Sequence, residues 1–222
     1  MIDAPGVGRV RLKRLPAQTG AVFSHIYLRF MTEAEVLTIF RRSGALLEGH
    51  FRLSSGLHSP GYLQCALVLQ HPREAEALGA ALGGLVRALG AQTVMSPALG
   101  GVVIGQEVGR ALNVRAIFAE RADGTLTLRR GFTLDPGEKV LIVEDVVTTG
   151  GSTRETIDVA RASGAIVVGA CAIVDRSGGK QGLDVPFHSL LPMDVKAYQE
   201  NECPLCQQGI PVVKPGSRTP KS

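Results

Sequence analysis

Hydrophobic and polar positions along the chain follow two different periods. Apolar residues recur every three or four positions over 33–46 and again over 72–89, which predicts two helices. The stretch between them, 49–64, combines short apolar runs with glycines and is typical of a hairpin. Thr32, followed three positions later by Glu35, predicts a capping box at the start of the first helix.

Beyond residue 90, short apolar runs alternate with helical patterns. This alternation predicts an α/β fold, in which a central parallel sheet is flanked by helices. The stretch 183–222 is rich in proline and is expected to be irregular. The strands expected from the pattern are 93–96, 114–120, 126–130, 140–143 and 166–174; the helices are 102–112 and a segment ending near 163.

Length and composition add few constraints. The chain has 222 residues, of which 45% are hydrophobic, enough for one sizeable core. No apolar stretch approaches the roughly 18–20 residues that span a bilayer, and the start lacks a secretory leader. We therefore expect a cytoplasmic protein that does not bind membranes.

The net charge of +4 comes from the first 30 residues. That stretch contains five basic side chains and one acidic side chain, so the rest of the chain is neutral. A basic arm of this kind can bind nucleic acid. Because Met31 and the residues after it look like a natural protein start, we instead expect 1–30 to be a disordered extension that binds no nucleic acid. A domain over 31–213 and a polar tail over 214–222 complete the predicted organisation.

The most informative stretch is 140–153. An apolar run, 140–143, predicts a fully buried strand, and the carboxylates of Glu144 and Asp145 follow at its end. A loop of small and hydroxylated residues, 148–153, leads into a helix. Hydroxyls and glycine N–H groups at a helix N-terminus cradle phosphate, and carboxylates accept hydrogen bonds from a vicinal diol. The combination suits a ribose 5-phosphate.

This stretch resembles the phosphoribosyl pyrophosphate (PRPP) motif of type I phosphoribosyltransferases. The resemblance implies the type I phosphoribosyltransferase fold, in which a small hood formed by N- and C-terminal segments accompanies the central parallel sheet. It also implies that Glu144 and Asp145 hold the ribose 2′ and 3′ hydroxyls while the loop grips the 5′-phosphate. The residues implied to bind PRPP here are Glu144, Asp145, Val146, Val147, Thr148, Thr149, Gly150, Gly151 and Ser152.

Two further segments resemble the orotate phosphoribosyltransferase family. One runs from Phe51 to Tyr62 and reads Phe-x-Leu-x-Ser-Gly-x-x-Ser-Pro-x-Tyr; the other is 172–176, which ends in Arg176. An arginine fork matches a carboxylate such as that of orotate, although Arg176 could equally form a surface ion pair. The resemblance implies that Thr148 and Arg176 contact orotate and that Tyr62 and Leu63 flank its ring.

The pyrophosphate side departs from the family pattern. The resemblance implies a pyrophosphate loop that includes Gly100 and Gly101, although a tight βα turn explains the same residues. Many relatives carry a lysine at the position of Gly100, and another at that of Ser54. The usual catalytic loop is short here, and only Arg121 matches one of its basic positions.

Arg129 and Arg130 lie close to this shortened loop. They either substitute for the missing lysines, reaching a neighbouring subunit, or form the solvated edge of a hairpin. The sequence leaves both interpretations open. Arg121 is expected to be catalytic, together with Glu144 and Asp145.

The implied reaction transfers the 5-phosphoribosyl group of PRPP to N1 of orotate, giving orotidine 5′-monophosphate and pyrophosphate in pyrimidine biosynthesis. The family further implies Mg²⁺, without direct protein ligands, and a homodimer with shared active sites. A purine phosphoribosyltransferase and a PRPP-sensing regulator without turnover are the alternatives.

Four cysteines are present. Cys65 and Cys171 lie in apolar runs and are expected in the core. Cys203 and Cys206 have the Cys-x-x-Cys spacing of a zinc half-site, and Gly209 follows them. Two ligands alone do not make a site, so distant residues or a second chain would have to complete it. A redox pair is the alternative.

Overall fold

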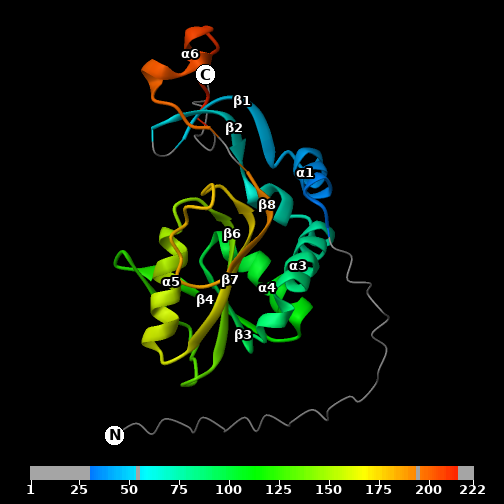
Figure 1. The fold of residues 1–222 in the computed structure, drawn as a ribbon, viewed down its shortest axis with the longest axis vertical. Helices are drawn as coiled ribbons and strands as arrows, with labels where there is room; N and C mark the ends of the chain where they lie inside the picture. The colour runs from blue at the N-terminus through cyan, green and yellow to red at the C-terminus, as the bar shows by residue number, and fades with distance from the viewer. Residues whose placement is uncertain (1–30, 54–55, 194–195, 215–222) are drawn as a thin grey trace, which may run out of the picture.

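The computed structural model describes residues 31–53, 56–193 and 196–214 (Figure 1). The extension predicted over 1–30, and all but the first residue of the tail predicted over 214–222, lie outside the described residues. No helix in the described part of the chain is long and apolar enough to cross a membrane.

The centre of the molecule is a six-stranded sheet with the order β5-β4-β3-β6-β7-β8. Neighbouring strands run parallel except β5, which pairs antiparallel with β4 at one edge. The α/β prediction is therefore confirmed. The strands are β3 (Thr93–Pro97), β4 (Arg115–Ala122), β5 (Thr125–Leu128), β6 (Lys139–Val147), β7 (Ile166–Asp175) and β8 (Phe187–Pro192).

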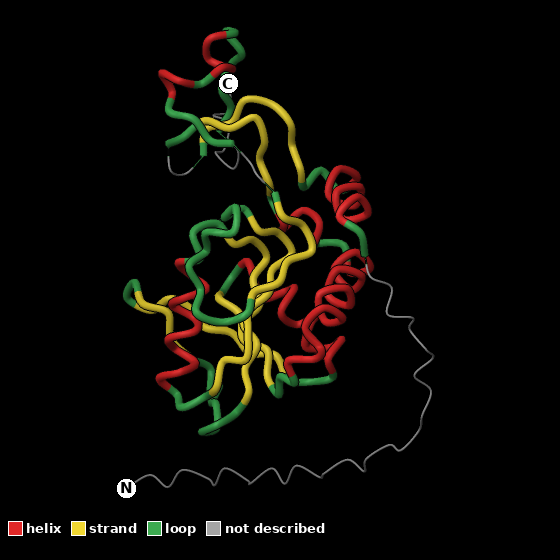
Figure 2. The backbone as a smooth tube through the Cα atoms, in the orientation of Figure 1, coloured by secondary structure: helices red, strands yellow, loops and turns green. Residues whose placement is uncertain are grey.

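Helices cover both faces of this sheet, as Figure 2 shows. Side chains of β6 alternate between the faces: Leu141 and Val143 join one core cluster, and Val140 and Ile142 join the other. The first cluster is covered by α3 and α4 and the second by α5. The helices of this domain are α1 (Glu33–Arg42), α2 (Cys65–Leu69), α3 (Pro72–Val86), with a 3₁₀ turn at Arg87–Leu89, α4 (Gly100–Leu112) and α5 (Gly151–Ala162).

A smaller unit, here called the hood, stands beyond the carboxyl ends of the strands (top of Figure 1). It consists of the antiparallel hairpin β1 (Leu46–Arg52) and β2 (His58–Leu63) and of the C-terminal segment, residues 196–214. The C-terminal segment contains a 3₁₀ turn at Glu200–Glu202 and the short helix α6 (Pro204–Gln207). The hood is thus formed by segments from both ends of the domain, as the family resemblance implies.

Three expectations from the sequence were wrong in detail. The strand predicted over 140–143 continues to Val147, so Glu144 and Asp145 lie within β6 rather than after its end. The first helix ends at Arg42 rather than near 46, because Gly44 takes a left-handed conformation (φ 68°) and the chain then enters β1. The stretch after 183 is not wholly irregular, since 187–192 forms β8 at the edge of the sheet. The capping box of Thr32 and Glu35 is present as predicted.

Candidate active site

A cavity of about 250 Å³ lies where β6 passes into α5. The first N–H groups of α5 have no side-chain cap, because the N-cap residue is Gly150. Such orphan N–H groups at a helix N-terminus form a site for an anion, which the adjacent hydroxyls extend. The residues that line the cavity are Glu144, Val146, Val147, Thr148, Thr149, Gly150, Gly151, Ser152, Thr153 and Glu155.

The loop 148–152 and the start of α5 are here called the phosphate cradle. The segment that follows β7 holds this loop in place. Gly150 has φ 74°, and a Cβ there would lie 2.5 Å from the carbonyl oxygen of Gln181. The Arg154 guanidinium donates to the Thr149 carbonyl at 2.9 Å and also to that of Gln181. Glycine is therefore required at 150 both for its backbone conformation and for the close approach of the two loops.

The two acids do not point the same way. They are consecutive residues of β6, so their side chains emerge on opposite faces of the strand. Glu144 lines the cavity on the α5 side, whereas Asp145 faces the start of α4. A ribose gripped by both carboxylates would therefore have to sit over the end of β6.

Glu144 is buried with one polar partner among the described residues, the Thr153 hydroxyl, which donates to its Oε1 at 3.1 Å. Burial, with a smaller contribution from the neighbouring Asp145 charge, raises the pKa of Glu144 to about 8, and the Thr153 hydrogen bond opposes the rise. Burial also raises the pKa of Asp145. Carboxyl groups with raised pKa values at the end of a sheet are typical of a ligand site.

The loop expected to bind pyrophosphate lies beside Asp145. A Cβ at Gly100 would lie 2.7 Å from Asp145 Oδ1, and one at Gly101 would lie 2.8 Å from the Val143 carbonyl oxygen. The N-terminus of α4 is exposed at Gly100, and the N-cap residue Leu99 gives it no side-chain cap. The absence of side chains at 100 and 101 allows the helix start to approach β6, so a second anion-binding helix end lies next to the acid pair.

The basic residues near the site differ in their partners. The Arg121 guanidinium pairs with Glu155 at 3.0 Å, and because Glu155 lines the cavity, this ion pair brings Arg121 to its rim. Arg130 pairs with Glu120 at 2.8 Å and Arg129 approaches the same carboxylate at 3.8 Å. Arg129 and Arg130 directly follow β5. Within one chain, they pair with Glu120 of the neighbouring β4 and so belong to the edge of the β4–β5 hairpin.

Arg176 directly follows β7, and its N–H donates to the Val147 carbonyl at 2.8 Å, beside the cradle. Its side chain forms no ion pair with any residue that the structure describes, and its buried Nε has no hydrogen-bond partner there. Burial lowers the pKa of this guanidinium. Arg176 is half-buried, and a buried N–H of a cation without a partner is costly, which favours a ligand carboxylate over a surface ion pair with Asp175.

Tyr62 and Leu63 do not line the cavity. Leu63 is buried in the core, and half-buried Tyr62 packs its ring against Phe51 at 5.9 Å between centroids. Their expected contact with a pyrimidine ring stays a prediction. Sequence reasoning missed Arg154 and Glu155, although both lie within the first five residues of the helix that the motif predicts.

Comparison with known proteins gives a consistent result. Residues 67–189 match the family model "Phosphoribosyl transferase domain". The chain is 56% identical to an orotate phosphoribosyltransferase of Heliobacterium modesticaldum and 53% identical to that of Pelotomaculum thermopropionicum. Each match covers 85% of this chain, and they cover 100% and 99% of those proteins. A crystal structure of orotate phosphoribosyltransferase from Aeropyrum pernix, 27% identical, superposes with a TM-score of 0.59 over 71% of this chain and 93% of that one. The chain belongs to the orotate phosphoribosyltransferase family.

Proposed function

We infer that the protein transfers the 5-phosphoribosyl group of PRPP to N1 of orotate, giving orotidine 5′-monophosphate and pyrophosphate. The structural observation that best supports this assignment is the state of the Arg176 side chain. The Arg176 backbone is hydrogen-bonded to Val147, which lines the cavity, and its buried Nε has no partner among the described residues; a ring carboxylate could accept two hydrogen bonds from this guanidinium. A purine base carries no carboxylate for this group, which argues against the purine alternative.

The site supplies positioning and charge stabilisation rather than a nucleophile. N1 of orotate attacks the ribose C1′ as pyrophosphate leaves, through an oxocarbenium-like transition state with inversion. The N–H groups at the start of α5 and the hydroxyls of 148–152 hold the 5′-phosphate. Glu144 and Asp145 hold the ribose hydroxyls from the two sides of the end of β6. Thr148 and Arg176 orient the orotate, with Tyr62 and Leu63 beside its ring.

The leaving pyrophosphate needs positive charge. The exposed N-terminus of α4, at Gly100 and Gly101, offers N–H donors to it, and Arg121 supplies a full charge from the rim of the cavity. Arg121 has to leave Glu155 to do so, and both residues are half exposed, so the cost of separating them is small. In a dimer with shared active sites, Arg129 and Arg130 would add to the partner's site.

Mg²⁺ fits this site as an ion carried by the substrate. The two carboxylates emerge on opposite faces of β6, and in the described residues they belong to no cluster of three or more potential ligands. The residues near the ion would be Asp145 and, through the ribose, Glu144. When bound, Mg²⁺ neutralises charge on the leaving group. We also propose a cytoplasmic location for the enzyme.

The test is orotate consumption followed by ultraviolet absorbance, with purified protein, PRPP and Mg²⁺. Loss of orotate that requires both PRPP and Mg²⁺ is expected, with no turnover of adenine, guanine or hypoxanthine. Binding of PRPP without turnover of any base would overturn the enzyme assignment in favour of a PRPP-sensing regulator.

A further inference from the structure

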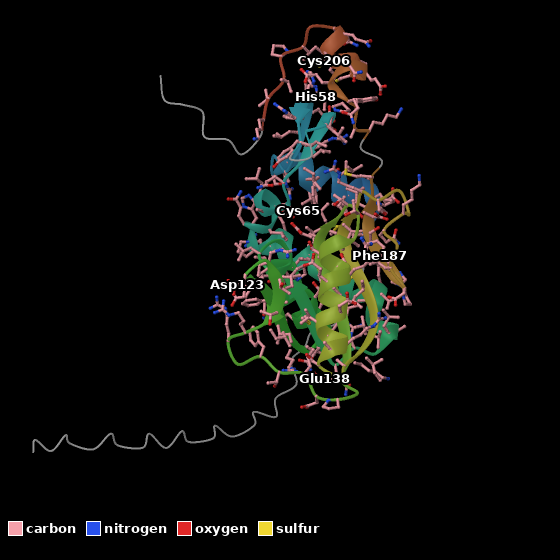
Figure 3. All side chains as sticks on the ribbon, turned by 90° about the vertical axis from the view of Figure 1, so that its left-hand side faces the viewer. His58, Cys65, Asp123, Glu138, Phe187 and Cys206 are labelled. Atoms are coloured by element: carbon pink, nitrogen blue, oxygen red, sulfur yellow. The ribbon has the colours of Figure 1, made fainter. Side chains whose placement is uncertain are left out.

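Four potential metal ligands, two from each of two distant stretches of the chain, converge in the hood. His50 lies on β1 and His58 on β2, while Cys203 and Cys206 flank α6 in the C-terminal segment. Their ligand atoms all lie within 4.8 Å of one another. Figure 3 shows His58 and Cys206 together at the end of the molecule that carries the hood.

The distances between the ligand atoms match the edges of a small tetrahedron. His50 Nε2 lies 2.9 Å from His58 Nδ1, 3.5 Å from Cys203 Sγ and 3.7 Å from Cys206 Sγ. His58 Nδ1 lies 3.2 Å from Cys206 Sγ. Zinc bonds of about 2.0–2.1 Å to nitrogen and 2.3 Å to sulfur give edges of roughly 3.3–3.8 Å for a tetrahedral site. A small outward movement of the two imidazoles would complete that geometry.

The imidazole of His50 is already oriented as a metal ligand. Its Nδ1 lies 2.7 Å from the Ile210 carbonyl oxygen, to which it donates, so Nε2 carries a lone pair aimed at the cluster. Metal-binding histidines commonly donate their second ring nitrogen in this way. His58 Nδ1, Cys203 Sγ and Cys206 Sγ all surround that single lone pair, which can accept only one hydrogen bond. A cation at the centre would instead bind all four ligand atoms.

The cysteine turn has the shape that such a site needs. Cys203 is the N-cap of α6 and Cys206 lies in its only turn, so both sulfurs face the same side. Gly209 follows with φ 68°, which turns the chain so that the Ile210 carbonyl reaches His50. Both cysteines are free thiols, and Cys203, His50 and His58 are buried, which excludes most water from the centre.

The described C-terminal segment contributes almost no buried apolar surface that could hold it in place against the hairpin. Among the described residues from 196 to 214, Cys203 is the only buried apolar side chain, while Ile210, Val212 and Val213 are exposed. Backbone hydrogen bonds join Tyr198 to His58 and Val213 to His50, so the segment borders both strands of the hairpin. Small units with so little buried apolar surface generally need a disulfide or a metal.

We propose that His50, His58, Cys203 and Cys206 bind one Zn²⁺, a structural site that fastens the C-terminal segment to the β1–β2 hairpin. Two nitrogen and two sulfur ligands in a tetrahedral array select zinc over Mg²⁺ or Ca²⁺, which prefer oxygen. All four positions of the tetrahedron are filled by protein, so the ion is structural rather than catalytic. Binding displaces the thiol protons, which pass to solvent. The site is separate from the cradle and does not depend on the proposed reaction.

The first test is the metal content of the full-length protein, purified without a tag or a chelator and measured by plasma mass spectrometry. One zinc ion per chain is expected. Cys203→Ser and Cys206→Ser should reduce zinc to background, whereas Cys171→Ala and His71→Gln, which alter a core cysteine and an exposed histidine outside the cluster, should retain it. Wild-type zinc content in either serine variant would overturn the proposal.

A second test does not depend on whether these variants fold. Zinc is removed from the wild-type protein with dipicolinate and replaced by Co²⁺. The expected spectrum has the intense visible bands of tetrahedral Co²⁺ and a near-ultraviolet sulfur-to-cobalt band, with saturation at one equivalent. The melting temperature should fall on removal of zinc and recover when it is restored. Failure of the metal-free protein to bind either ion in a fixed ratio would refute the site.

Discussion

The Asp145 carboxylate lies directly against Gly100, where a Cβ would approach Oδ1 to 2.7 Å and Oδ2 to 2.9 Å. One end of the acid pair is therefore packed on the backbone of the loop expected to bind pyrophosphate. This contact links the ribose and pyrophosphate sides of the site, and it leaves no room for a side chain at position 100 unless Asp145 moves.

Gly100→Ala should impair catalysis without unfolding the protein. The added methyl group displaces the Asp145 carboxylate from its backbone hydrogen bonds, so we expect kcat/KM for PRPP to fall about tenfold or more, equivalent to roughly 1.4 kcal/mol. Steady-state kinetics and a thermal melt measure the two effects. Gly79→Ala is the matched control: its Cβ would lie 2.8 Å from backbone carbon of Glu107, so it should lower the melting temperature instead. A similar loss of melting temperature in both variants would contradict this view.

Asp145→Asn should lose most of its turnover while keeping its fold. The amide retains the size of the side chain but loses the charge that the ribose and the transition state require, a loss of about a hundredfold in kcat for a preorganised electrostatic contact. Circular dichroism and the melting curve should match the wild type. Near wild-type kinetics in this variant would remove Asp145 from the catalytic group.

Glu144 should make stability fall as the pH rises. Its pKa is about 8 in the folded protein and near 4.5 in the unfolded chain, so only the folded state holds the proton between these values. The stabilisation is complete below the lower value, and it is lost by up to about 1.4 kcal/mol per pH unit until the higher value is reached. Urea unfolding at several pH values measures this slope. Glu144→Gln should flatten it, and an unchanged slope in that variant would assign the effect elsewhere.

The same carboxyl group predicts proton release when PRPP binds. Ribose hydroxyls donating to Glu144 favour its ionised form and lower its pKa, so near neutral pH the complex should shed up to one proton from this group. Calorimetric titrations in buffers with different ionisation enthalpies measure the number released. Glu144→Gln supplies the baseline for protons that come from PRPP itself, and equal release from both proteins would exclude Glu144.

Arg176→Met should weaken orotate binding selectively. Removal of a charged, two-pronged contact costs about 1.5–3 kcal/mol, which is roughly a ten- to hundredfold rise in KM for orotate. KM for PRPP should hardly change. Arg161→Met, which removes an exposed arginine paired with Asp184, is the control. Arg176→Lys should recover only part of the loss, because an ammonium group cannot form the fork. Parallel changes in both KM values would argue for a structural role.

The part of the site that could be predicted from sequence is the part whose residues are consecutive in the chain. Residues 144–152 form one unbroken motif, so the strand, the cradle and the helix after it could all be inferred from local pattern. Contacts between distant segments leave no such local pattern, because they depend on how the chain folds back. Examples are the hydrogen bond from Arg154 to the Gln181 carbonyl, the Arg121–Glu155 ion pair and the edge strand 187–192. The cysteine pair was visible, but nothing in the spacing pointed to two histidines about 150 positions earlier.

The connectivity of the hood has a consequence for biosynthesis. Both strands of its hairpin emerge from the ribosome early, yet their backbone partners at Tyr198 and Val213 are among the last described residues to be made. The nascent chain therefore carries a hairpin with unpaired edges throughout synthesis of the sheet, and closure across so many residues is slow. Assembly of the hood therefore follows synthesis of the sheet, and a chain truncated before Tyr198 would keep the phosphate cradle but leave both strands of the hairpin without their C-terminal backbone partners.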